Sequence, residues 1–129
     1  MPVEPVPAPS APAPAGPYSP VVRAGDWLVL AGQIGLDPAS RTLVGGGVAA
    51  QARQALSNLS GVLRDCGASW ADVAKVTVFI TDAASFATVN DAYTEAIGDH
   101  RPARSTVVVA GLPGGALVEI EAWAYSPAG

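Results

Sequence analysis

The sequence predicts an α+β domain in which two helices cover one face of a mixed sheet. Two segments carry apolar residues at helical spacing, and five shorter ones alternate or run apolar as strands do. Their order along the chain is ββαβαββ, which is typical of a two-layer α+β domain. The chain has 129 residues and is half apolar, which suffices for one core and not for two.

Residues 1–17, MPVEPVPAPSAPAPAGP, are mostly proline and alanine. Proline has no amide donor and a fixed φ, so this segment is expected to form neither a helix nor a sheet ladder. We predict an extended Pro/Ala-rich tail over 1–17 and a single domain over 18–129 that begins near Tyr18.

Two strands at 21–23 and 27–31 form the predicted first hairpin. The turn between them, Ala24-Gly25-Asp26, offers a glycine where a positive φ is needed. Gly32 ends the second strand, and the residues at 37–47 form a glycine-rich loop.

Apolar residues recur every three or four positions over 48–66, which predicts the first helix. Gly67 is placed to end it in a left-handed cap. Cys66 lies on the apolar stripe and is interpreted as a small buried hydrophobic residue. The stripe comprises Ala52, Ala55, Leu56, Leu59, Val62, Leu63 and Cys66.

A strand is predicted at 73–81, where apolar and polar residues alternate. Asp82 is suited to cap the second helix, and Gly98 ends that helix. Two further strands follow at 104–110 and 116–125. The apolar stripe of the second helix is Phe86, Val89, Tyr93 and Ile97.

The last strand, ALVEIEAWAY, has two faces of different character. One face is small and apolar and suits packing under the helices. The other mixes Glu119 and Glu121 with Leu117, Trp123 and Tyr125, which is costly both to leave in water and to bury. We therefore predict an oligomer whose interface includes this face.

Composition argues against several classes of function. The net charge is −4 and the seven basic residues are scattered, so no nucleic-acid partner is expected. Cys66 is the single cysteine, which excludes an internal disulfide and fits a reducing cytoplasm. No charged leader precedes an apolar segment and no apolar run reaches 18 residues, so no membrane partner is expected.

The usual metal and cofactor sites find little support. His100 is the one histidine and Cys66 the one cysteine, so no zinc ligand set can be assembled, and we expect no metal and no cofactor. His100 lies in a polar loop and is expected on the surface, which leaves no plausible nucleophile–histidine pair. The glycines at 45–47 precede a helix but lack a following Lys-Ser or Lys-Thr, so a flexible loop is favoured over a phosphate site.

Arg104 stands out because it leads directly into an apolar strand. It could form a structural salt bridge with a glutamate of the last strand. Alternatively, its planar fork could grip a small carboxylate through two parallel hydrogen bonds. A nearby glutamate could then act as a base that holds water against an activated C=N bond.

Six segments of the chain closely resemble the RidA/YjgF family, from about Ala13 to Tyr125. The resemblance implies a chorismate-mutase-like (RidA-like) fold and a homotrimer with sites in the clefts between subunits. It also implies hydrolysis of 2-imino acids and their enamine tautomers, such as 2-aminoacrylate and 2-iminobutyrate, to 2-oxo acids and ammonia. The segments are APAGPYSP, AGQIGLDP, AQARQALSNLSGVL, KVTVFITDAASFATVNDAY, RPARSTVVV and GALVEIEAWA.

The resemblance also implies site residues. Arg104, in PARS, would bind the substrate carboxylate, and Glu119, in VEIEA, would position the attacking water. Tyr18, in GPYS, would line the cleft. Gly32 would contribute backbone contacts, and Asn90, in FATVN, would lie on a helix near the site.

Three positions depart from the family pattern. Ala31 replaces a usual serine, so a hydroxyl near the substrate is missing, and Thr106 replaces a common cysteine. Pro20 stands where glutamine is frequent. Two other functions therefore remain open: a non-catalytic trimer that binds small carboxylates or regulates a partner, and ribonuclease activity, which the acidic net charge opposes.

Overall fold

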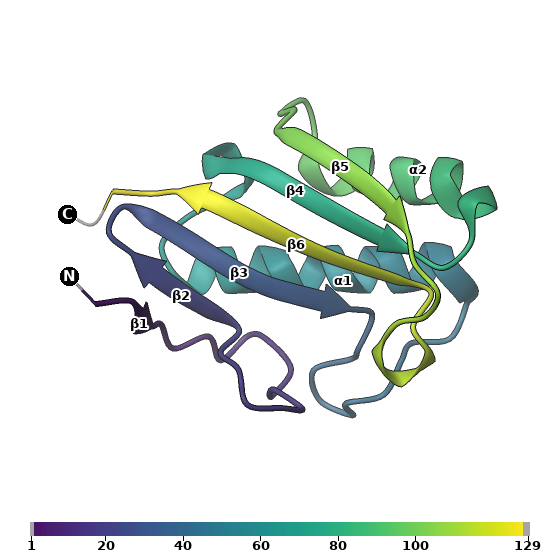
Figure 1. Ribbon diagram of the computed structural model, residues 1–129, viewed down its shortest axis with the longest axis horizontal. Helices are drawn as coiled ribbons and strands as arrows, with labels where there is room; N and C mark the ends of the chain where they lie inside the picture. Colours follow the sequence, from purple (N-terminus) through teal and green to yellow (C-terminus); the bar gives the residue numbers. More distant parts are fainter. Residues whose placement is uncertain (1, 128–129) are drawn as a thin grey trace.

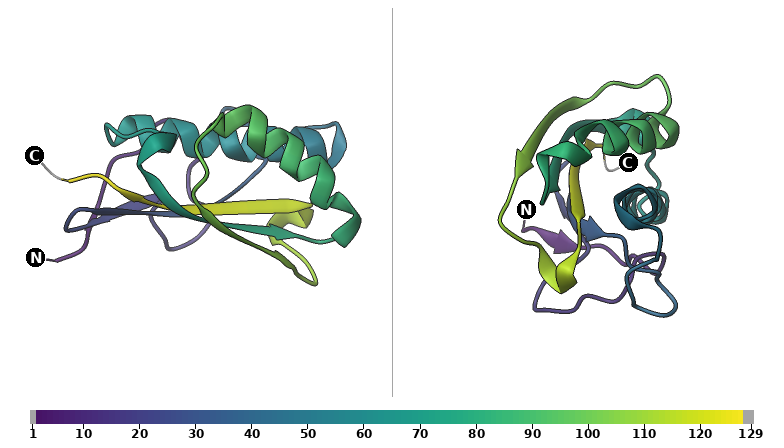
Figure 2. Two further views of the ribbon diagram at one scale, coloured as in Figure 1. Left: turned by 90° about the horizontal axis from the view of Figure 1, so that it is seen from above. Right: turned by 90° about the vertical axis from the view of Figure 1, so that its right-hand side faces the viewer.

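The computed structural model of the chain describes residues 2–127. It consists of a six-stranded sheet with two helices on one face (Figure 1). The strand order is β1-β2-β3-β6-β4-β5. Figure 2 shows the two helices together on one side of the curved sheet, while the other face of the sheet carries no helix. The predicted α+β class with two helices on a mixed sheet is confirmed.

The first hairpin joins β2 (Val21–Ala24) to β3 (Trp27–Ile34). The two strands pair antiparallel, and Gly25 takes the positive φ of 61° that the turn requires. The strand β3 runs three residues beyond the predicted end because it also pairs with β6 (Val118–Tyr125), through an irregularity between Leu30 and Gln33.

The first helix, α1 (Gly47–Asp65), forms within one residue of its predicted bounds. Its predicted apolar stripe is buried against the sheet, apart from Cys66, which is half-buried and packs at the edge of the core. Gly67 has a φ of 74° and its amide donates to the Arg64 carbonyl, which ends the helix as predicted.

The second helix is entered through a short 3₁₀ turn that the sequence did not indicate. The short helix η1 (Trp70–Asp72) leads into β4 (Val73–Ile80). Asp82 then caps η2 (Ala83–Ser85) by accepting a hydrogen bond from the Ala84 amide, and α2 (Phe86–Ile97) follows directly.

The last two strands make the sheet mixed. The strand β5 (Ala103–Val108) lies parallel to β4, and η3 (Pro113–Gly115) connects it to β6. The strand β6 is antiparallel to both β3 and β4 and lies between them. The crossover through α2 therefore places β5 at the sheet edge beside β4.

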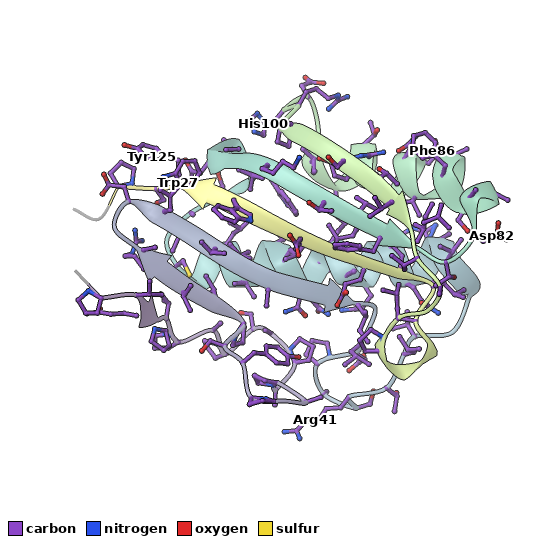
Figure 3. The ribbon with its side chains drawn as sticks, viewed as in Figure 1. Trp27, Arg41, Asp82, Phe86, His100 and Tyr125 are labelled. Carbon is purple, nitrogen blue, oxygen red and sulfur yellow. The ribbon has the colours of Figure 1, made fainter. Side chains whose placement is uncertain are left out.

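The two faces of β6 differ as predicted. Val118, Ile120, Ala122 and Ala124 are fully buried under the helices. On the opposite face, Trp123 and Tyr125 are 45% and 48% exposed and contact Trp27 edge-on at centroid distances of 6.4 and 5.2 Å. Figure 3 shows Trp27 and Tyr125 side by side at one end of the sheet. The helix-free face thus carries an aromatic cluster exposed in the single chain.

The N-terminal segment is more ordered than its composition predicts. The expectation that it forms no sheet ladder is wrong at β1 (Glu4–Pro5), which pairs antiparallel with β2. Proline is tolerated there because β1 is an edge strand. Ser10 donates through both its amide and its hydroxyl to the Asp65 carboxylate, and Ala11 is buried. The position at which an independently folding domain begins stays a prediction.

We expect Gly35→Ala to lower the free energy of unfolding by about 1–3 kcal/mol. A Cβ at Gly35 would lie 2.6 Å from the Cα and 2.7 Å from the carbonyl oxygen of Gln51, so the β3 end and α1 would have to separate. Chemical denaturation measures the loss. Gly45→Ala is the matched control, because its Cβ would meet nothing within 4 Å. Equal stability of the two variants would contradict this close packing.

Candidate active site

Three of the predicted site residues line one pocket. Tyr18 comes from the loop before β2, Gly32 from β3 and Glu119 from the start of β6. The pocket has a volume of about 90 Å³ and opens toward the helix-free side of the sheet, since Glu119 alternates with the buried Val118 and Ile120. These residues are brought together although they are far apart in sequence.

Gly32 makes room for the Glu119 carboxylate. A Cβ at this position would lie 2.9 Å from both Cδ and Oε2 of Glu119. Any other residue would push the carboxylate away, so the requirement for glycine here is one of space. Gly32 itself lines the pocket, as its predicted backbone contacts with a ligand require.

Burial raises the pKa of the Glu119 carboxyl above its ordinary value, and the charge of Glu121 on the same face of β6 raises it further. A carboxylate in this condition is a stronger base than an ordinary glutamate. It is also ionised only at a higher pH, so any activity that uses it as a base falls as pH drops through this raised pKa.

Glu121→Gln is expected to move the acid limb of kcat/KM to lower pH. The substitution removes one of the two causes of the raised pKa, so Glu119 stays ionised at a lower pH. A pH–rate profile measures the limb. Glu95→Gln, on the exposed surface of α2, is the matched control and should leave the limb in place. A limb unmoved by Glu121→Gln would show that Glu119 is not the titrating base.

The other two predicted residues, Asn90 and Arg104, line a second groove of about 330 Å³. The Nη2 atom of Arg104 donates a hydrogen bond to Oδ1 of Asn90. The Arg104 guanidinium carbon lies 4.7 Å from the ring centroid of Tyr93 and 5.6 Å from that of Phe86. The side chain is therefore held by one face of α2 through a hydrogen bond and two cation–π contacts.

Sequence reasoning missed the part played by Phe86 and Tyr93. It placed both on an apolar stripe, yet Phe86 is 48% exposed and its ring faces Arg104. The sequence could have indicated this contact by the positions of the two aromatic residues relative to Asn90, at i−4 and i+3, which put all three on one helix face. The Tyr93 hydroxyl is buried and has no hydrogen-bond partner within residues 2–127, and burial raises its pKa.

Two buried amides that sequence reasoning did not single out position the Glu119 pocket. Asn58 donates through Nδ2 to the Leu36 carbonyl at 2.9 Å, and Gln51 accepts from the Leu117 amide at 2.8 Å. They thereby tie the end of β3 and the start of β6 to α1. The sequence could have indicated them by their spacing of seven residues on the buried face of a helix, because a buried polar group without a hydrogen-bond partner is costly there.

The two groups of site residues lie on opposite faces of the sheet. Arg104 pairs with the buried Val76 and contacts α2, whereas Glu119 pairs with Phe79 and faces away from the helices. The strand β4 separates them. The Cα atoms of Arg104 and Glu119 are offset by three residues along the strands and by two strand spacings across the sheet, which puts them roughly 14 Å apart. One protomer therefore does not present both groups to one small molecule.

The positions that depart from the family pattern lie close to both groups. The Ala31 amide donates to the Pro20 carbonyl at 2.9 Å, so Pro20 is used as an acceptor and its missing amide is not needed there. Thr106 lies on β5 two residues after Arg104 and pairs with Val78. Ala31 is thus the chain neighbour of Gly32, which lines the Glu119 pocket together with Pro20.

His100 is not the surface residue that was expected. It is half-buried, and its Nε2 lies 2.8 Å from the Val73 carbonyl oxygen, which links the end of α2 to β4. No group of three or more His, Cys, Asp or Glu side chains within residues 2–127 is placed to hold a metal ion. In the same part of the chain, neither helix has the length and apolar character to cross a membrane.

Comparison with known proteins shows the family. The profile of the family described as Endoribonuclease L-PSP matches residues 8–126. A RutC family protein of Pyrococcus horikoshii is 46% identical over 116 residues, which are 90% of this chain and 92% of the relative. The 2-iminobutanoate/2-iminopropanoate deaminase of Bos taurus is 46% identical over 112 residues, 87% of this chain and 82% of the relative.

A solved structure supports the same assignment. RidA from an Antarctic Psychrobacter has a TM-score of 0.89 and 38% identity to this chain, and the match covers 93% of this chain and 97% of that one. With the family profile matching most of the sequence and the fold matching throughout, the chain belongs to the RidA/YjgF family.

Proposed function

We propose that this protein hydrolyses reactive 2-imino acids and their enamine tautomers, such as 2-aminoacrylate and 2-iminobutyrate, to 2-oxo acids and ammonia. The observation that best supports the proposal is the pocket in which Tyr18 and Gly32 lie beside the Glu119 carboxyl group, whose pKa is raised by burial. Relatives at about 45% identity are named for deamination of two such imines, which supports the proposal.

In the proposed reaction Arg104 binds the substrate carboxylate through its guanidinium fork. Glu119 accepts a proton from a water molecule as the water oxygen attacks the imine carbon. The nitrogen takes up protons, the C–N bond breaks and ammonia leaves, which yields the 2-oxo acid. Tyr18 lines the cleft, the Gly32 backbone contacts the substrate and Asn90 holds Arg104.

The reaction further requires that copies of the chain share sites, and we propose a homotrimer with the sites between subunits. Arg104 and Glu119 lie on opposite faces of β4 and cannot meet within one protomer. When the Arg104 face of one copy meets the Glu119 face of the next, the contact is head-to-tail, and such a contact closes into a ring of three when each copy is rotated by a third of a turn from the last. Burial of the exposed aromatic cluster of Trp27, Trp123 and Tyr125 would favour association.

We propose a cytoplasmic protein whose partners are a small imino or oxo acid and its own copies, without nucleic acid or membrane. The net charge of −4 supports this, because RNA binding draws on clustered cations. A non-catalytic trimer that binds carboxylates is the second candidate, favoured by the alanine at position 31 where the family pattern has serine.

A coupled assay tests the proposal. A threonine dehydratase generates 2-iminobutyrate in situ and semicarbazide traps the imine that remains. At a fixed dehydratase rate, the protein should lower the amount of semicarbazone. An unchanged amount would reject imine hydrolysis, and 2-oxobutanoate binding by calorimetry would then decide whether the carboxylate-binding trimer stands.

A further inference from the structure

A second arginine lines the groove that holds Arg104. The groove residues are Asn90, Tyr93, Thr94, Arg101, Pro102 and Arg104. Both charged residues in this set are arginines, in a chain of net charge −4 with seven basic residues in all. The groove therefore differs in sign from the chain as a whole, and an anion is the ligand that such a lining attracts.

The Arg101 side chain is anchored at the C-terminal end of α2. Its Nη1 atom donates to the carbonyl oxygens of Gly98 and His100. Both bonds use the same nitrogen, so Nε and Nη2 keep their hydrogens for other acceptors. An arginine that is already fixed at one end loses little conformational freedom when it binds a ligand.

Arg101 and Arg104 act on the same part of the groove. The charges of both arginines oppose the rise in the pKa of the Tyr93 hydroxyl that burial causes. Arg104 stands over the Tyr93 ring, and Asn90 is its hydrogen-bond acceptor within residues 2–127. Two arginines thus line one groove of about 330 Å³, which is enough to hold a small ligand.

We propose that the groove selects substrates with two carboxylates, so that the preferred class is the 2-imino dicarboxylic acids. Arg104 takes the carboxylate next to the imine carbon, and Arg101 takes the carboxylate at the other end of the molecule. The inference rests on the proposed hydrolysis and names its substrate class. The chemistry at the imine carbon is unchanged: the water oxygen joins the carbon, the C–N bond breaks and ammonia leaves.

Binding of two product analogues tests the proposal without turnover. The probes are 2-oxoglutarate and 2-oxopentanoate, which have the same chain length and differ in the terminal carboxylate. Calorimetry at low salt should give a Kd for 2-oxoglutarate about tenfold lower with the wild-type protein, as expected for a charge-assisted contact. Equal or weaker binding of 2-oxoglutarate would overturn the proposal.

Substitution of Arg101 then assigns the preference to this residue. Arg101→Gln should bring the ratio of the two Kd values close to one, and Arg101→Lys, which keeps the charge but not the fork, should give an intermediate ratio. Arg53→Gln, an exposed arginine of α1, is the matched control and should keep the wild-type ratio. A ratio unchanged in both Arg101 variants would overturn the proposal.

These measurements distinguish failure of the dicarboxylate proposal from failure of the proposed function. Arg101→Gln also removes the contacts to the end of α2, so its thermal transition is measured first. If that variant does not fold, Arg101→Lys and the wild-type ratio decide. An Arg101-dependent preference without imine hydrolysis would reject the proposed function and keep the dicarboxylate groove. Hydrolysis of 2-iminobutyrate without the preference would do the reverse.

Discussion

Arg104→Ala is expected to lower kcat/KM for 2-iminobutyrate by roughly 10²–10⁴. In the proposed role of Arg104, the variant would lose two charge-assisted hydrogen bonds to the substrate carboxylate, each of which contributes about 1.5–3 kcal/mol. The semicarbazide assay measures the loss of activity, and calorimetry with 2-oxobutanoate measures the accompanying loss of affinity. Because Arg104 is half-buried at a sheet edge and not part of the apolar core, the fold and the oligomeric state should persist.

Two further variants are the controls for this result. Arg104→Lys keeps the charge but loses the planar fork, so it should recover only part of the affinity. Arg53→Ala removes an exposed arginine of α1 and should behave as the wild type. Turnover by Arg104→Ala at the wild-type rate would refute its role in binding the carboxylate, and loss of assembly by light scattering would indicate a structural role instead.

Glu119→Gln should keep affinity for 2-oxobutanoate and lower kcat by about 10²–10⁴, the usual contribution of a general base. Glutamine has nearly the same size, so the space beneath Gly32 stays filled and Tyr18 keeps its neighbour. It does not accept a proton from water. Single-turnover rates and calorimetry, performed on the same preparation, separate the loss of chemistry from any loss of binding.

The neighbouring glutamate is the natural control for that experiment. Glu121 lies on the same face of the same strand, so Glu121→Gln changes charge in the same region without touching the pocket lining. It should retain most of its turnover at neutral pH. If Glu119→Gln lost binding and turnover in equal measure, Glu119 would be holding the pocket together and would not be a base.

Much of the fold followed from local patterns. The 48–66 stripe, the alternation of β4 and β6 and the glycines after both helices each specify one element and its buried face. The N-terminal segment could not be predicted this way. Its proline content argues against pairing in general, but β1 is at the sheet edge, and the Val6 amide bonds the Val21 carbonyl all the same.

The candidate site was likewise predicted only in part. The resemblance to the RidA/YjgF family named Tyr18, Gly32 and Glu119, and these three do line one pocket. The contacts of Phe86 and Tyr93 with Arg104 escaped prediction, because an aromatic residue on a helical stripe gives the same pattern whether it packs in a core or faces a cation. The choice depends on Arg104 of β5 lying over these two rings of α2, which is a tertiary property.

The position of β4 between Arg104 and Glu119 has a chemical consequence for the chain on its own. Had the two side chains shared a face on adjacent strands, they would attract one another and close into an ion pair, and any substrate would have to displace one charge to reach the other. With a strand between them and opposite orientations, neither charge neutralises the other. The topology therefore keeps the carboxylate and the guanidinium from pairing with each other within one chain, and both stay available for the substrate of the proposed reaction.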